Sequence, residues 1–109
     1  MKKVFYEKLE FDLMNGWGVN NNKLLKIDIE SIDNCDNFIW NKFSEDMLNI
    51  INPSKSIIID VGWYPKFDMN GRFVLLVIKN NEWTKPLETL VTRDVNKIIE
   101  KVNYVVNFF

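Results

Sequence analysis

Alternation of apolar and polar residues is clearest in the second half of the chain, where two strands and their connection follow one another. Residues 56–62 and 72–79 are rich in β-branched and aromatic side chains, and Pro65, Asn70 and Gly71 lie between them. Two such runs separated by turn-forming residues predict a β-hairpin.

Three further segments complete the predicted sheet. Residues 3–13 fit both helical and strand spacing, and we favour a strand. The cluster of Asn and Gly at 15–22 predicts a turn, and residues 23–32 then alternate apolar and charged residues as a half-buried strand does. Residues 87–91 predict a shorter strand, after a turn at Asn80-Asn81.

Two segments have the apolar spacing of a helix. The first begins after an Asp or Asn cap, ends at Asn52-Pro53 and measures about four turns. Its apolar stripe consists of Ile39, Phe43, Met47, Ile50 and Ile51. The second begins with Thr92 or Asp94 as cap and continues to the end of the chain.

The resulting order is ββαβββα. We therefore predict an α+β fold, in which a mostly antiparallel sheet of about five strands carries two helices packed on one face. A length of 109 residues fits a single domain spanning residues 1–109.

Composition and apolar run lengths are those of a soluble globular protein. Hydrophobic residues make up 47% of the chain and charged residues 27%. The longest apolar run is residues 73–78, whereas a membrane span needs about 20 residues. The first residues lack the apolar stretch of a secretory signal, and the lone Cys35 cannot form an internal disulfide. We expect a cytoplasmic protein.

Signatures of catalysis are missing from the sequence. The chain has no histidine, which is the commonest general acid/base and a usual zinc ligand. Gly16 and Gly18 lack the further glycine and lysine of a nucleotide-binding loop. Carboxylates on the predicted strands could perform acid/base chemistry, but Asp28 and Glu30 share a solvent-exposed face. We expect no enzymatic activity, no cofactor and no metal.

Charge is unevenly distributed along the chain. Residues 27–60 contain two lysines and seven acidic residues, although the net charge of the whole chain is only −1. Asp28, Glu30, Asp33 and Asp36 supply four of these acids within nine residues. A negative field of this kind speeds encounter with basic partners and disfavours nucleic acid. The alternative is a solvated strand face followed by a helix N-terminus.

Aromatic and charged residues gather at both ends of the predicted hairpin, and such mixtures are typical of protein-binding surfaces. The candidate partner-binding residues at the first end are Asp60, Trp63, Tyr64, Lys66, Asp68 and Arg72. A later connection adds Glu82 and Trp83, and the acidic segment adds Asp28 and Glu30. For each tryptophan the alternative is that the ring folds back and closes the core.

The stretch from Ile59 to Asp94, with GWYP followed by TRD, resembles small immunity proteins of bacterial contact-dependent growth inhibition and related polymorphic toxin systems. The resemblance implies a compact α+β domain without enzymatic activity. It also implies tight binding to one cognate toxin C-terminal domain, in many systems a basic nuclease, whose active site or substrate surface is blocked inside the producing cell. We expect no direct binding to nucleic acid or membrane. A small adaptor or self-associating interaction domain remains the alternative.

Overall fold

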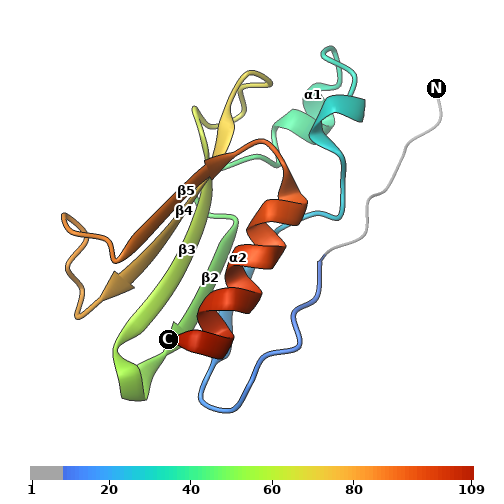
Figure 1. The fold of residues 1–109 in the computed structure, drawn as a ribbon. Helices are drawn as coiled ribbons and strands as arrows, with labels where there is room; N and C mark the ends of the chain where they lie inside the picture. Colours follow the sequence, from blue (N-terminus) through green and yellow to red (C-terminus); the bar gives the residue numbers. More distant parts are fainter. Residues whose placement is uncertain (1–8) are drawn as a thin grey trace.

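The computed structural model describes residues 9–109, which form an antiparallel five-stranded sheet with strand order β1-β2-β3-β4-β5 (Figure 1). The strands are β1 (Gly18–Asn22), β2 (Leu48–Asn52), β3 (Ile57–Tyr64), β4 (Arg72–Lys79) and β5 (Glu88–Thr92). The helices are α1 (Asn37–Trp40) and α2 (Val95–Phe108), and two 3-10 turns lie at Ile29–Ser31 and Pro53–Lys55. The predicted α+β class, with five antiparallel strands and two helices, is confirmed.

The second half of the chain folds as its pattern predicts. β3 and β4 pair along their whole length, from Ile57 with Lys79 to Tyr64 with Arg72. β5 begins and ends one residue later than the predicted strand at 87–91. α2 is capped by Asp94, whose carboxylate accepts the N–H of Asn96 at 2.9 Å. These elements are stabilised largely by residues near them in sequence, so a local pattern suffices to find them.

The predicted helix at 39–51 is wrong over most of its length. α1 ends at Trp40, and residues 48–52 form β2. Leu48 and Ile50 point into the core while Ile51 lies on the other side, so the segment satisfies strand alternation as well as helical spacing. Pairing with β1 and β3 decides between the two.

The first third of the chain also departs from its pattern. Residues 3–8 of the first predicted strand lie outside the described residues, and residues 9–13 form no strand. β1 lies inside the predicted turn at 15–22. Residues 23–32 contribute no strand to the sheet. Their last part forms a 3-10 turn at Ile29–Ser31, which the Asp28 carboxylate caps by accepting the N–H of Glu30 at 3.0 Å.

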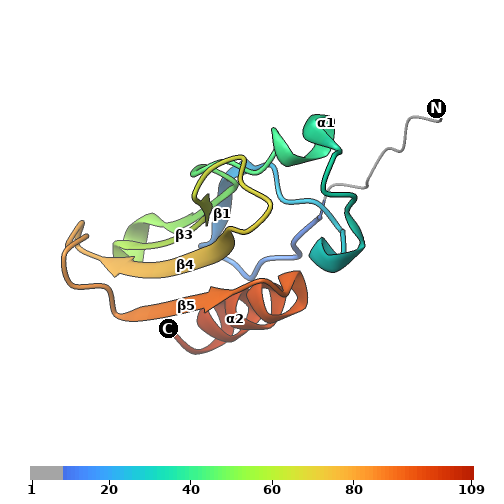
Figure 2. The same cartoon turned by 90° about the horizontal axis from the view of Figure 1, so that it is seen from above.

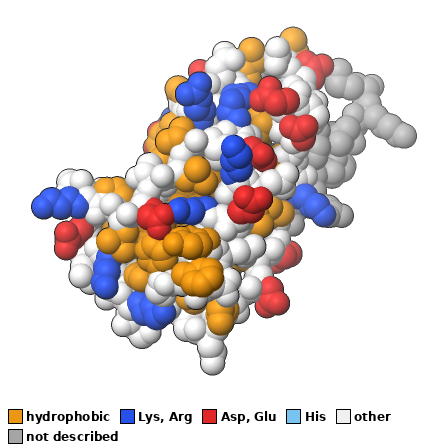
Figure 3. Space-filling view, in the orientation of Figure 1, with side chains coloured by type: hydrophobic (Ala, Val, Ile, Leu, Met, Phe, Trp, Pro, Cys, Tyr) orange, Lys and Arg blue, Asp and Glu red, His pale blue; other side chains and the backbone are white. Residues whose placement is uncertain are grey.

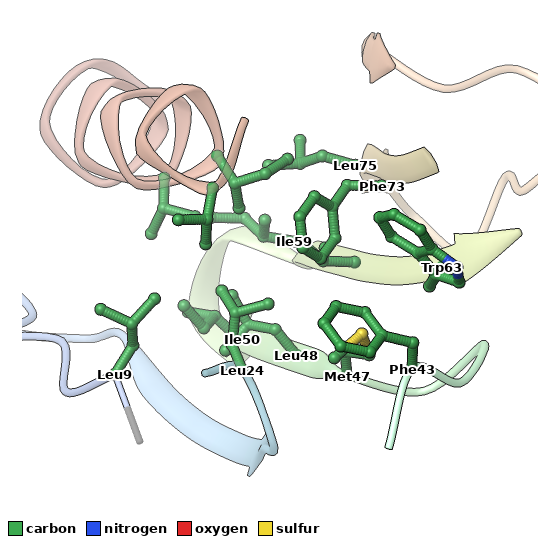
Figure 4. Packing of buried hydrophobic residues seen from close by; sticks show 14 of the residues in the cluster. Leu9, Leu24, Phe43, Met47, Leu48, Ile50, Ile59, Trp63, Phe73 and Leu75 are labelled. Carbon is green, nitrogen blue, oxygen red and sulfur yellow. The ribbon is translucent and has the colours of Figure 1, made fainter. Parts of the chain in front are cut away.

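One face of the sheet carries the hydrophobic core. α2 lies along this face, while α1 sits beyond the strand ends and adds Ile39 and Trp40 to the same cluster (Figure 2). Figure 4 shows Ile59 and Leu75 of the sheet on one side of the cluster and Leu24 and Met47 on the other. Both helices thus contribute to the core on one face of the sheet, and the described residues place no helix on the opposite face.

Candidate partner-binding surface

The face of the sheet opposite the core is called here the open face. The strand register assigns to it the alternate residues of the four strands β2 to β5. They are Asn49, Ile51, Ile58, Asp60, Gly62, Tyr64, Arg72, Val74, Leu76, Ile78, Thr89 and Val91. Most of these side chains are half-buried or exposed, which shows that the described residues leave much of the face uncovered.

Apolar side chains run across the open face, in two pairs that the half-buried Leu76 on β4 connects. Ile51 pairs with Ile58 across β2 and β3, and Val74 pairs with Val91 across β4 and β5. Ile51, Ile58 and Val74 are half-buried, and Val91 is 53% exposed. An exposed apolar strip on a sheet marks a surface that gains free energy when a partner covers it.

Acidic side chains gather at one end of this strip. Glu45, Asp46 and Asp60 lie near Tyr64, and these four residues are called here the acidic corner. The chain bulges at 45–46 because Ser44 O accepts the Trp63 N–H while the Met47 N–H is donated to Val61 O. Glu45 and Asp46, which lie between Ser44 and Met47 in the sequence, therefore lie over Gly62.

Gly62 makes this arrangement possible. A Cβ atom at residue 62 would lie 2.4 Å from the Glu45 carbonyl oxygen and 2.8 Å from a ring carbon of Tyr64. Only glycine leaves room for the backbone of 45–46 to approach β3 so closely. The glycine of the GWYP sequence thus positions two carboxylates above the sheet.

Asparagine side chains hold the acidic residues in place. Asn49 Nδ2 donates to Asp60 Oδ1 at 3.3 Å, and Asn20 Nδ2 donates to Asn49 Oδ1 at 3.2 Å. On the neighbouring edge, Asn21 Nδ2 donates to Asp46 Oδ1 at 2.9 Å. The carboxylates are therefore oriented by neutral donors, and their negative charge is not cancelled by these contacts.

Two members of the acidic corner, Asp60 and Tyr64, have raised pKa values. Burial raises the pKa of Asp60, the Asn49 hydrogen bond opposes the rise, and the nearby Asp46 adds to it. Burial also raises the pKa of the Tyr64 phenol, and the charges of Asp60, Glu45 and Asp46 raise it further. A cationic group placed here would relieve the unfavourable proximity of these negative charges.

The structure brings three predicted partner-binding residues together on the open face. Asp60 and Tyr64 alternate along β3, and Arg72 lies directly opposite Tyr64 on β4. Lys66 and Asp68 lie in the adjoining β3–β4 connection and are exposed.

Trp63 is not a surface residue, and its prediction as a partner-binding side chain is wrong. It is fully buried, with its ring 4.9 Å from those of Phe43 and Phe73, and Figure 4 shows it pointing into the core. Its indole N–H donates to Asp68 O at 2.7 Å, so the ring closes this end of the core. Strand alternation places Trp63 and Tyr64 on opposite faces.

The other predicted residues lie away from this surface. Glu82 and Trp83 are exposed in the β4–β5 connection, beyond the opposite end of β4. Asp28 and Glu30 line a separate hollow of about 620 Å³ beside the start of α2. Glu30 pairs with Arg93 at 2.8 Å.

The acidic segment at 28–36 has structural uses that the sequence left open. Asp28 caps a 3-10 turn, the Asp33 carboxylate accepts the Cys35 N–H at 2.8 Å, and Asp36 caps α1. The cap at Asp36 agrees with the helix N-terminus of the alternative interpretation, whereas Asp28 and Glu30 lie on no strand of the sheet.

Sequence reasoning missed Glu45, Asp46, Asn49 and Ile51 as members of a surface. All four fell inside the predicted helix, where their neighbours would have been different. Two features of the sequence could have indicated a strand here. They are the alternation of LNIIN at 48–52 and the presence of Gly62 on the strand that follows a short connection.

Within residues 9–109, no cluster of three or more acidic or cysteine side chains is arranged to hold a metal ion. No helix in the same part of the chain is long and apolar enough to cross a membrane. The sequence matches no protein-family profile and no curated protein, and the fold matches no solved structure.

Proposed function

We propose that the chain is an immunity protein, which binds and neutralises a cognate toxin domain in the cytoplasm, and that the open face is its binding surface. The observation that carries the proposal is the exposed combination of an apolar strip with an acidic corner on one side of the sheet. The resemblance of residues 59–94 to immunity proteins supports the same assignment.

Apolar contact would supply most of the affinity in this proposal. The strip of Ile51, Ile58, Val74 and Val91 would be removed from water by the toxin, and Tyr64 would serve as an aromatic anchor at its end. Buried aromatic anchors commonly contribute about 2 kcal/mol or more each to an interface.

Charge would orient the toxin on the open face and raise the rate of association. A Lys or Arg of a basic toxin would enter the acidic corner, where Asp60 is half-buried and oriented by Asn49. Complementary charge raises association rates and excludes wrongly charged partners. The chain thus acts by occluding the toxin's active site or substrate surface, without turnover of its own.

Growth protection tests the proposal. The toxin domain is taken from the large open reading frame expected immediately upstream, and is expressed in cells with or without the 109-residue chain. Wild-type chain is expected to restore growth. Val91→Arg, which adds positive charge to the open face, is expected to protect poorly while keeping its fold.

A matched control separates the open face from surface charge in general. Val19 is 46% exposed, close to the 53% of Val91, but the register pairs it with the core residue Ile50. Val19→Arg is therefore expected to protect as wild type does. Equal protection by both variants would remove the open face from the interface. Absence of a toxin gene beside this one would favour an adaptor function instead.

A further inference from the structure

The two edge strands of the sheet, β1 and β5, differ in how they are protected from pairing with a further strand. β1 carries a register shift between Val19 and Asn21, and its sequence is GVNNN. β5, with the sequence ETLVT, pairs with β4 without interruption. Natural sheets commonly blunt their edges with bulges and with polar or charged residues, because a regular edge recruits another strand. Among the described strands, β1 has both a bulge and a run of polar residues, whereas β5 has a regular register and one charged residue, Glu88.

The outer edge of β5 offers main-chain hydrogen-bonding groups. The Leu87 N–H donates to Val77 O at 2.8 Å, so the main-chain groups of Val77 point toward β5. Because the register pairs Val77 with Glu88, the main-chain groups of Glu88 point toward β4. Main-chain groups alternate between inward and outward along a strand, so those of Thr89 and Val91 point away from β4. Within residues 9–109, no strand pairs with this side of β5.

A hollow of about 420 Å³ runs between β5 and α2. Its apolar lining includes Leu90 and Tyr104, and Tyr104 packs against Phe108 with ring centroids 5.3 Å apart. Tyr104 is 47% and Phe108 75% exposed, and Figure 3 shows hydrophobic side chains gathered on this side of the molecule with charged groups around them. This aromatic surface adjoins the strand edge.

We infer that a second copy of this chain pairs with β5, antiparallel about a two-fold axis near Leu90, so that the two sheets join into one. In this register Thr89 of each copy faces Val91 of the other. Both residues present an outward N–H and C=O, so the pairing forms reciprocal main-chain hydrogen bonds. The same operation brings the two Leu90 side chains together on the helix side.

The charges beside this edge are compatible with self-association. The rim of the hollow carries both signs, with Lys97 and Glu100 on α2 and the ion pair of Lys101 with Glu88. A two-fold axis places each rim against an identical one, so a rim of mixed sign allows attraction where a rim of one sign would repel. The net charge of −1 adds little general repulsion. This interface uses an edge and leaves most of the open face accessible.

Sedimentation equilibrium of the 109-residue chain tests the inference, over concentrations from about 1 to about 500 µM. Wild-type mass is expected to rise from one chain to two. Thr89→Pro removes an outward N–H without removing a bond to β4, and is expected to weaken association at least about tenfold. Thr89→Ala, which keeps the N–H, is the matched control and is expected to behave as wild type.

Amide hydrogen exchange supplies a measurement that needs no variant. Exchange at Thr89 and Val91 is expected to slow as the wild-type concentration rises, while exchange at Asn20 on the opposite edge stays constant. A wild-type chain that remains monomeric throughout the range would overturn the inference. Equal association by Thr89→Pro and Thr89→Ala would overturn it as well.

Discussion

The covered face and the open face of the sheet are built from neighbouring residues of the same strands, yet their side chains meet different surroundings. Trp63 is fully buried among Phe43 and Phe73, whereas Tyr64, the next residue, is 41% exposed beside Asp60. The covered face contains interlocking rings and aliphatic side chains. The open face combines a half-buried to exposed apolar strip with carboxylates held by asparagines.

We propose that this difference separates the residues that stabilise the fold from those that recognise a partner. Burial of the covered face supplies the hydrophobic free energy of folding, so its residues are constrained by packing. On the open face, the half-buried Asp60 has a raised pKa, which means that its ionised form is disfavoured in the folded protein. A surface that retains such a group gains most when a partner supplies the missing positive charge.

The largest expected effect distinguishes the two neighbours on β3. Trp63→Ala removes a fully buried ring and is expected to lower the free energy of unfolding by about 3 to 5 kcal/mol. Tyr64→Ala removes an exposed ring and is expected to cost less than about 1 kcal/mol. Urea unfolding of both variants measures the difference. Similar losses in the two would mean that the faces are not distinct.

A second effect concerns the glycine that lets 45–46 approach the sheet. Gly62→Ala places its Cβ against the Glu45 carbonyl and is expected to cost about 1 to 3 kcal/mol, as overpacking does. Gly18→Ala is the matched control, because nothing lies within 4 Å of its added Cβ. Its stability is expected to stay within about 0.5 kcal/mol of wild type. Tolerance of Gly62→Ala would mean that the acidic corner is not held by this contact.

The smallest effect is a pH dependence carried by Asp60. Its folded-state pKa lies above the ordinary value of 3.8, so the folded protein binds more protons than the unfolded chain between those two values. Stability contributed by this residue is therefore present at low pH and is lost as pH rises through that window. Asp60→Asn is expected to lack this loss.

The measurement is the difference in unfolding free energy between wild type and Asp60→Asn, followed upward from about pH 3. Titration of the other carboxylates largely cancels in this difference. A difference that stays constant with pH would show that the environment of Asp60 does not disfavour its charge.

Local patterns in the sequence predict those parts of the fold that local contacts stabilise. The β3–β4 hairpin, β5 and α2 follow from alternation, turn residues and caps. β2 could not be assigned in this way, because LNIIN is a strand only by pairing with β1 and β3 on both sides. The polar strand β1 has no hydrophobic pattern of its own.

The candidate surface depends on the same long-range pairing. Asp60, Tyr64 and Arg72 could be predicted because they lie on or beside the hairpin. Glu45 and Asp46 could not, since they reach the open face only when residues 44–47 follow β3 with a bulge. Trp63 was assigned to the surface by its proximity to a turn, although its parity along β3 places it with Ile59 and Val61 in the core.

The central claim is the proposal that the open face binds a partner, and the dissociation constant measured with the proposed cognate toxin domain tests it most directly. Tyr64→Ala is compared with Tyr104→Ala, since the two tyrosines are 41% and 47% exposed on different surfaces. The account predicts that Tyr64→Ala weakens binding about thirtyfold or more, while Tyr104→Ala leaves it unchanged. Unchanged binding by a folded Tyr64→Ala, or equal weakening by both variants, would contradict it.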